Sequence, residues 1–513
     1  MSLGVLKSTY YSSVSIYFEY LLGLVISILV ARSLGIEAFG LYGYLVKVAG
    51  IAIILTNAGI GIGAIKFIAE ARAVGAYEDI HAIHAYFKRI QHIKILIVTG
   101  AIAALTLLFP GLLVEAEYQH LIVFLLFSVV FKSAHMYRVG VLKGFERFDF
   151  LAFIVLVVAP LNLILVTIAY FFGASLSLMF CIFAGVSVLY YIVSEFYVRK
   201  LVVSKNKPKS PELSESLKIR IKHHLKVVSI NTVVSVLVLG QCEVLLLKHF
   251  VSNEAVALFN IASILSNAAI SLVPGVYSLI LLPMIAKSVT VANGNPAFKI
   301  SESVRYLFVL AVMVAVPSFV YGESIVILLY GEDFVDAGWV FGTLTLVGVL
   351  VAFRDPINAY LLSTDKQSIL LKFSFYALIM SLVINYFFIS IWGLKGAVLA
   401  FTIVSVVLTV LLVSIARKYL KLEIDYKKLG MTLLASALSM AIIFELSSYF
   451  SGGVEVIVGF IGFGLLYIVN IVLFNCLTEA DYEVILLLSK KGGRFIEGFF
   501  MFLVTHRLNK PRF

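Results

Sequence analysis

The sequence has few charged residues for its length. Of its 513 residues, 13% are Asp, Glu, Lys or Arg and 61% are hydrophobic, and the mean hydropathy is +1.05. Soluble globular domains carry about 25% charged residues. This composition therefore excludes a soluble protein and is typical of a chain that lies mostly within a lipid bilayer.

Motifs that carry chemistry are also scarce. The three cysteines, Cys181, Cys242 and Cys476, fall within hydrophobic segments, and their spacing suggests neither a disulfide nor a metal site. No segment has the GxxxxGK pattern of a phosphate-binding loop, so we do not expect the chain to hydrolyse ATP. No predicted helix carries a set of metal ligands. We therefore expect no catalytic residues, no metal and no cofactor.

The sequence does contain long apolar segments. A bilayer core about 30 Å thick needs about 20 apolar residues per helix. About fourteen segments meet this need, at roughly 10–33, 39–65, 91–113, 119–142, 150–172, 175–198, 224–248, 255–286, 303–330, 338–362, 368–391, 395–417, 429–450 and 454–476. The predicted fold is an all-α polytopic membrane protein of about 14 transmembrane helices.

The basic residues predict the orientation of these helices. With the N-terminus in the cytoplasm, about 36 of the 40 lysines and arginines fall on the cytoplasmic side when helix ends, including Lys132 and Arg138, are counted with it. Both termini are then cytoplasmic. The net charge of +11 reflects this topology, so we expect no nucleic-acid partner. The outer loops are short, which argues against an enzyme that would need a large external loop for its catalytic groups.

A short loop sequence recurs half a chain apart. Residues 37–42 (EAFGLY) return as 254–259 (EAVALF), 217 residues later, and the ends of later helices recur at nearly the same offset. Because an even number of helices separates the copies, the repeat is parallel. We expect a six-helix lobe at 1–200, a cytoplasmic linker at 201–223, a second six-helix lobe at 224–420, two extra helices at 421–476 and an amphipathic cytoplasmic tail at 477–513.

Several segments resemble one family of transporters. Residues 31–42 (ARSLGIEAFGLY), 57–60 (NAGI), 66–70 (KFIAE) and 142–148 (LKGFERF) are similar to loops of the polysaccharide transporters, the O-antigen (Wzx-type) flippases. That family belongs to a superfamily that includes lipid II flippases and multidrug exporters. The resemblance implies two lobes around a central cavity, alternating access without ATP, and a polyprenyl-diphosphate-linked oligosaccharide as substrate. It also makes the polysaccharide polymerase machinery a candidate partner and the cell membrane the expected location.

Polar residues at membrane depth are the candidate site residues, because charges there usually face a cavity or a partner. Lys47, Arg32 and Arg138 are expected to neutralise the diphosphate of the substrate. Amide side chains on the same helix faces are expected to bind sugar hydroxyls: Asn57, Asn260 and Asn267. The alternative for these amides and for the accompanying glycines and serines is helix packing.

Two acidic residues are candidates for ion coupling. Glu19 lies deep in the first predicted helix and Glu243 in the seventh. We expect Glu19 to pair with Lys47 when it is ionised and to release the lysine when it is protonated; a permanent structural pair is the alternative. An acidic residue in the first helix is also compatible with a cation-coupled multidrug (MATE-type) exporter, the second functional hypothesis. The cationic residues favour an anionic substrate and hence a flippase.

Overall fold

The computed structural model describes residues 3–202, 213–238, 242–272, 281, 284–289, 295–364, 366–420 and 422–477, and every regular element in these ranges is a helix. The expected linker falls largely, and the expected tail almost wholly, outside the described residues. The helices of the first half are α1 (Leu3–Asn57), α2 (Ile60–Ala73), α3 (Tyr77–Leu108), the 3-10 turn η1 (Ala116–Tyr118), α4 (Leu121–Gly144), α5 (Phe148–Phe171), α6 (Leu176–Val202), α7 (Glu215–Val238) and α8 (Cys242–Phe250).

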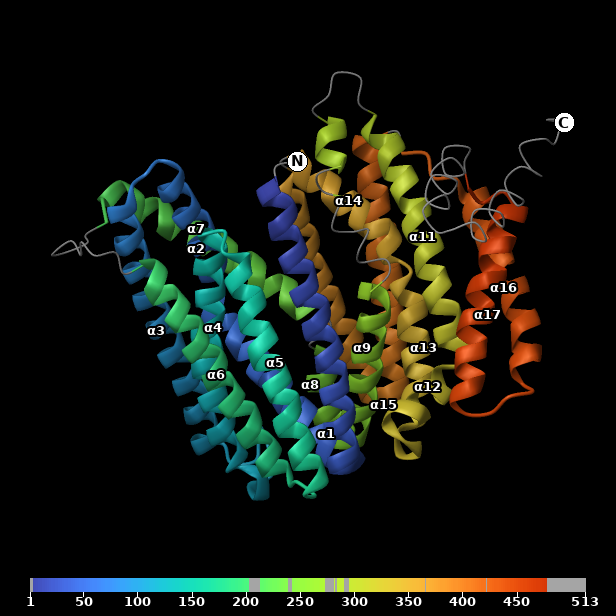
Figure 1. Cartoon of the computed structure of the whole chain (residues 1–513), viewed down its shortest axis with the longest axis horizontal. Helices are drawn as coiled ribbons and strands as arrows, with labels where there is room; N and C mark the ends of the chain where they lie inside the picture. Colours follow the sequence, from blue (N-terminus) through green and yellow to red (C-terminus); the bar gives the residue numbers. More distant parts are fainter. Residues whose placement is uncertain are drawn as a thin grey trace. The chain divides into compact units, whose positions relative to one another are not determined.

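The second half continues with helices of similar length (Figure 1). They are α9 (Asn253–Leu272), α11 (Pro296–Val320), α12 (Gly322–Tyr330), the 3-10 turn η2 (Glu332–Phe334), α13 (Ala337–Gly348), α14 (Val351–Ser363), α15 (Gln367–Tyr419), α16 (Tyr426–Ser447) and α17 (Gly453–Leu473). Two of the helices are double-length and break at a glycine with non-helical backbone angles, α1 at Gly35 and α15 at Gly393. A glycine adopts positive φ at such breaks without steric cost.

Ten of the described helices are long and apolar enough to cross a bilayer, or eleven if the bent pair α13 and α14 is one span. The chain is therefore an all-α, multi-pass membrane protein. The two double-length helices each cover two of the apolar segments expected from the sequence, whereas other segments are divided between two helices. The count of fourteen spans stays a prediction.

Two compact units make up the chain. Unit 1 contains 1–260 and 373–400, and unit 2 contains 261–372 and 401–513. These boundaries differ from those of the lobes expected from the repeat, so the lobes stay a prediction. One backbone feature agrees with a parallel repeat: a positive-φ glycine and a 3-10 turn follow α3 and recur after α12, at Gly111 with η1 and at Gly331 with η2.

Each unit has its own apolar core. In unit 1, buried side chains of α2, α3 and α4 pack together, among them Phe67, Phe87 and Tyr137. In unit 2, α16 and α17 lie side by side and α17 also packs on α11 (Figure 1). The Tyr467 hydroxyl donates to the Val309 carbonyl at 2.9 Å, and Asn470 donates to Ser439 at 2.9 Å. Such hydrogen bonds hold membrane helices together, since no water is available to satisfy their polar groups.

Candidate functional site

Lys47 lies in the second half of α1, three turns beyond the Gly35 break, and is half-buried. Its ammonium group interacts electrostatically with the carboxylate of Glu243. Both residues belong to unit 1. Lys47 makes no hydrogen bond with any residue that the structure describes. A lysine held at membrane depth with one acidic neighbour and free donor capacity is suited to meet an anionic ligand.

Glu243 lies in the first turn of α8 and is almost fully buried, with 3% of its surface exposed. Its Oε1 accepts a hydrogen bond from the Asn385 amide at 3.1 Å, and that amide also donates to Ser381 at 3.1 Å. Glu243 Oε2 and Asn385 Oδ1 are buried without a hydrogen-bond partner among the described residues. Buried oxygens normally find a donor or a cation. The group formed by Lys47, Glu243, Ser381 and Asn385, here called the Lys47–Glu243 cluster, therefore has unused acceptor capacity.

Glu19 has a different basic neighbour from the one expected. The side chain of Glu19 is exposed, and it interacts electrostatically with Lys132 of α4. The Lys132 ammonium lies 3.7 Å from the centre of the Tyr190 ring, and the His135 ring tilts against the same tyrosine at 4.9 Å. The expected Glu19–Lys47 pair is therefore wrong, because Lys47 has Glu243 as its acidic neighbour and Glu19 has Lys132. Lys132 also lies in the middle of α4 rather than at a helix end.

Arg138 forms a buried ion pair. Its Nε donates to Glu195 of α6, its Nη1 donates to the Ala134 carbonyl at 2.7 Å, and its guanidinium lies 4.5 Å from the centre of the Tyr191 ring. Arg138 is 1% exposed. The Glu195 carboxylate also accepts a hydrogen bond from Arg199 at 2.7 Å. These contacts satisfy Arg138 within the protein, and its role toward a diphosphate stays a prediction.

Asn57 takes part in helix packing. Its Oδ1 accepts from Gln91 of α3 at 3.0 Å, and the same Gln91 amide donates to the Ser133 carbonyl at 2.6 Å. Ser133 in turn shares a hydrogen bond of 2.6 Å with Thr56. This network joins α1, α3 and α4, so the structure favours the packing alternative for Asn57.

The helix break after Asn57 explains the rest of its motif. Gly59 has φ 75°, and the carbonyl of Ala58 that the break leaves free accepts hydrogen bonds from Lys94 at 2.9 Å and from Ser229 at 2.6 Å. A β-carbon at Gly59 would come 2.7 Å from the Ser229 hydroxyl oxygen. Residues 57–60 therefore make a tight junction among α1, α2, α3 and α7.

The remaining candidates are dispersed. Asn260 is buried, and its amide lies where a β-carbon on Gly43 would approach it to 2.5 Å, so it also packs against a glycine. Asn267 and Arg32 have exposed side chains, and Asn267 belongs to unit 2. The described residues contain no group of three or more His, Cys, Asp or Glu able to hold a metal ion.

Three polar residues were not singled out from the sequence: Asn385 and Ser381, which belong to the Lys47–Glu243 cluster, and Lys132, which lies beside Glu19. Asn385 and Ser381 are four residues apart in an otherwise apolar stretch of α15, a spacing that puts both on one helix face. Lys132 is a cation eleven residues into α4, and the next lysine or arginine of that helix is Arg138. Both signals were readable, but nothing local in the sequence indicates which other helix each would face.

Comparisons with solved structures identify the fold. The lipid II flippase MurJ in an inward closed conformation has a TM-score of 0.72 at 12% identity, with 90% of this chain and 98% of that chain covered. An inward-facing multidrug resistance MATE family transporter has a TM-score of 0.65 at 17% identity, covering 78% and 94%. A Vibrio cholerae MATE transporter has a TM-score of 0.57 at 16% identity, covering 81% and 97%.

Sequence comparison identifies the family. No curated protein matches the chain. The family described as polysaccharide biosynthesis protein matches residues 5–289, more than half of the chain. This is the family to which the transporter-like motifs of the N-terminal half had pointed, and the chain belongs to it.

Proposed function

We propose that this chain is a flippase that moves a polyprenyl-diphosphate-linked oligosaccharide from the inner to the outer leaflet of the cell membrane by alternating access. Membership of the polysaccharide biosynthesis family and a fold shared with a lipid II flippase support transport of a glycan carrier. The observation that carries the proposal is Lys47, a cation at membrane depth that keeps all its hydrogen-bond donors available among the described residues. An ammonium group binds phosphate as a compact point charge.

Glu243 is the better candidate for ion coupling, because it is the acid that interacts with Lys47. In its ionised form it attracts the lysine. Protonation of Glu243 removes that attraction and leaves Lys47 to the diphosphate. Proton and substrate then alternate at one cluster, which is the condition for coupling two binding events. Glu19 remains a second candidate.

Transport into proteoliposomes tests the cationic role. We expect Lys47→Met to slow the flipping of a polyprenyl-diphosphate oligosaccharide by about tenfold or more, the effect of losing one charge-assisted hydrogen bond to phosphate. Lys132→Met is the matched control, because it removes another cation at membrane depth that lies beside Glu19 and Tyr190. Equal transport by the Lys47→Met and wild-type proteins at equal protein level would refute the proposal.

A pH gradient across the same vesicles tests the coupling. Glu243→Gln mimics the protonated carboxyl at nearly constant shape, so we expect binding to persist while the response to the gradient is lost. Glu19→Gln should keep the response. The reverse result would return the coupling role to Glu19, and a gradient response kept by both variants would refute coupling through either acid.

A cation-coupled multidrug exporter is the second candidate function. The observation in its favour is the unused acceptor capacity of Glu243 and Asn385, which suits a bound cation as well as a proton. The two functions differ in the sign of the substrate. Thermal unfolding with a lipid diphosphate sugar and with a cationic drug separates them, since only a ligand that binds the folded state raises the unfolding temperature.

A further inference from the structure

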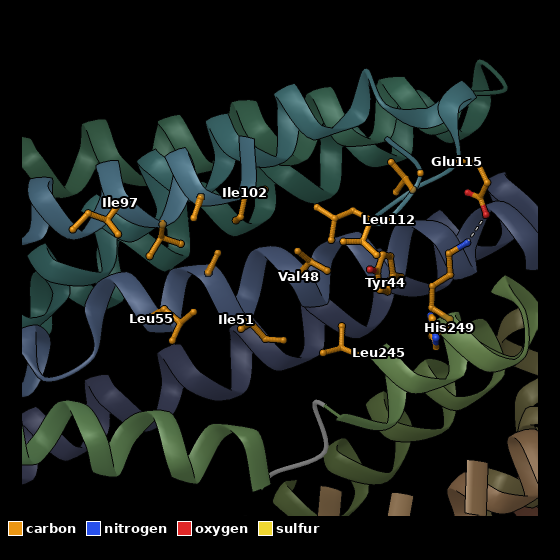
Figure 2. Close-up of a pocket in the computed structure, with 17 residues that line it drawn as sticks. Tyr44, Val48, Ile51, Leu55, Ile97, Ile102, Leu112, Glu115, Leu245 and His249 are labelled. Atoms are coloured by element: carbon orange, nitrogen blue, oxygen red, sulfur yellow. Dashed lines mark hydrogen bonds and ion pairs between the residues drawn. The ribbon is translucent and has the colours of Figure 1, made fainter. Parts of the chain in front are cut away.

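A groove of about 720 Å³ lies within unit 1, and neither Lys47 nor Glu243 is among the residues that line it. Its walls are the second half of α1, the face of α3 around Ala101, the loop that follows α3, and α8 (Figure 2). Most of its lining residues are apolar. A volume of this size is typical of sites for small amphiphilic or drug-sized ligands.

The groove has a polar end and an apolar end. Tyr44, Glu115 and His249 gather at one end, while Leu55 lies at the other (Figure 2). Lys248 belongs to the polar end because it donates a hydrogen bond to Glu115. Lys248 and His249 lie in the last turn of α8 and Glu115 in the loop after α3, where helices leave the apolar core of a membrane. The apolar part therefore points toward the bilayer centre, as the chain of a lipid does.

The length of the groove matches one leaflet. Tyr44 and Leu55 are eleven residues apart on one helix, which is about 16 Å at 1.5 Å per residue. Half of a bilayer core is about 15 Å. A single acyl chain with its headgroup at the interface fits this dimension, whereas a compact soluble ligand would leave the apolar end unfilled.

The groove lies beside a helix that packs little against the rest of the described chain. The most apolar window of α3 is 11% buried, against 28% or more in the other nine candidate spans of the described chain. The side chains of Leu96 and Leu107 on this helix are exposed. A helix this exposed is accessible to bilayer lipids, and the groove is lined by residues of the same helix.

The polar end holds one cation paired with one carboxylate, and this cation is the group that can bind an anionic headgroup. The Lys248 ammonium donates to Glu115 at 2.7 Å and to the Asn253 side-chain oxygen at 2.7 Å, and His249 is exposed next to it. Glu115 is on a loop and its side chain is 55% exposed, so a phosphate can replace it. Asn253 still orients the lysine after that exchange.

We propose that this groove binds one anionic glycerophospholipid of the membrane, with an acyl chain along α1 and α3 and its phosphate at Lys248 and His249. The site does not depend on the transport function proposed above. The bound phospholipid would be a second ligand of the chain, distinct from the substrate that it carries.

Native mass spectrometry of the full chain tests the headgroup. We expect phosphatidylglycerol to bind and phosphatidylcholine to bind about fivefold more weakly. Lys248→Gln should lower the affinity for phosphatidylglycerol by about fivefold, which is the effect of one lysine beside an anionic lipid. Glu115→Gln breaks the same ion pair but keeps the cation, so it should bind phosphatidylglycerol as well as or better than the wild type. Equal binding of the two lipids, or no effect of Lys248→Gln, would overturn the assignment.

A second pair of variants tests the apolar part. Ala101→Trp fills the groove at an exposed position, and Ala104→Trp puts the same side chain on α3 outside it. We expect at least about a fivefold loss of phosphatidylglycerol binding for the first and none for the second. Binding unchanged by Ala101→Trp would overturn the site. So would competition by inorganic phosphate alone, or occupation by polyprenyl phosphate in place of phosphatidylglycerol.

Discussion

Gly40 lies directly against the backbone of Asn253, so that a β-carbon at position 40 would come 1.8 Å from the Asn253 carbonyl oxygen. One turn further along α1, Gly43 meets the Asn260 amide in the same way. Gly40 lies within the first copy of the repeated segment, 37–42, and Asn253 directly precedes the second copy, 254–259. The contact between α1 and α9 therefore involves both copies. Glycine at position 40 is required there by the distance between the two backbones.

The first prediction concerns this contact. Gly40→Ala should lower the free energy of unfolding by about 2 kcal/mol or more, because backbone atoms rather than a flexible side chain must move. Gly50→Ala is the control on the same helix, since nothing lies within 4 Å of its β-carbon position. Thermal unfolding in detergent measures both. Equal midpoints for the two variants would contradict the close approach.

The second prediction separates two ion pairs that share one carboxylate. The side chain of Arg138 is 2% exposed and that of Arg199 is 71% exposed, and both bind Glu195. Arg138→Met should cost about 3 kcal/mol, because it leaves the Glu195 carboxylate without its buried partner. Arg199→Met should cost much less, because its side chain is largely exposed to solvent. Similar losses from the two substitutions would show that burial does not decide the strength of these pairs.

The third prediction is a double-mutant cycle in the Lys47–Glu243 cluster. Lys47→Met leaves an acidic side chain buried without its cation and should cost about 2 kcal/mol or more. The double variant Lys47→Met, Glu243→Gln should recover most of that loss, because no net charge then remains in the cluster. Additive losses in the cycle would mean that the two side chains do not interact.

The fourth prediction concerns pH. The hydrogen bond from Lys248 lowers the pKa of Glu115 below its ordinary value of 4.5. The stabilisation from this pair is therefore complete above pH 4.5 and is lost as the pH falls through the lowered pKa. Because Glu115 is largely exposed, the loss should be about 1 kcal/mol or less. Glu115→Gln should abolish this part of the acid dependence of the unfolding midpoint, and an unchanged profile in that variant would assign the dependence to other groups.

Much of the architecture could be predicted because it follows from local patterns. The all-helical fold and the positions of most apolar segments came from hydropathy, and the family came from short loop motifs. The helix break at Gly59 was not predicted, although residues 57–60 were recognised as a motif, because the apolar run 39–65 continues across it. Hydropathy records which residues tolerate lipid and does not record where the backbone turns.

The site could be predicted only in part, for a physical reason. Lys47 and Glu243 were each selected as charges at membrane depth, and the structure brings them together. Their pairing was not predicted, because helix periodicity indicates which residues share a face but not which helix that face meets. Glu19 was assigned to Lys47 because the two are opposite charges at membrane depth in the first two predicted helices, whereas tertiary packing puts Glu19 beside Lys132.

The burial of Cys242 offers a way to follow the cluster in time. This thiol is 4% exposed and adjoins Glu243 in the chain, whereas Cys181 is exposed and Cys476 is buried. In a Cys181→Ser, Cys476→Ser background, a water-soluble maleimide would react at one position only. The rate of this reaction would report how often the first turn of α8 becomes accessible from water. A natural cysteine would thus measure the opening of the protein interior around Glu243.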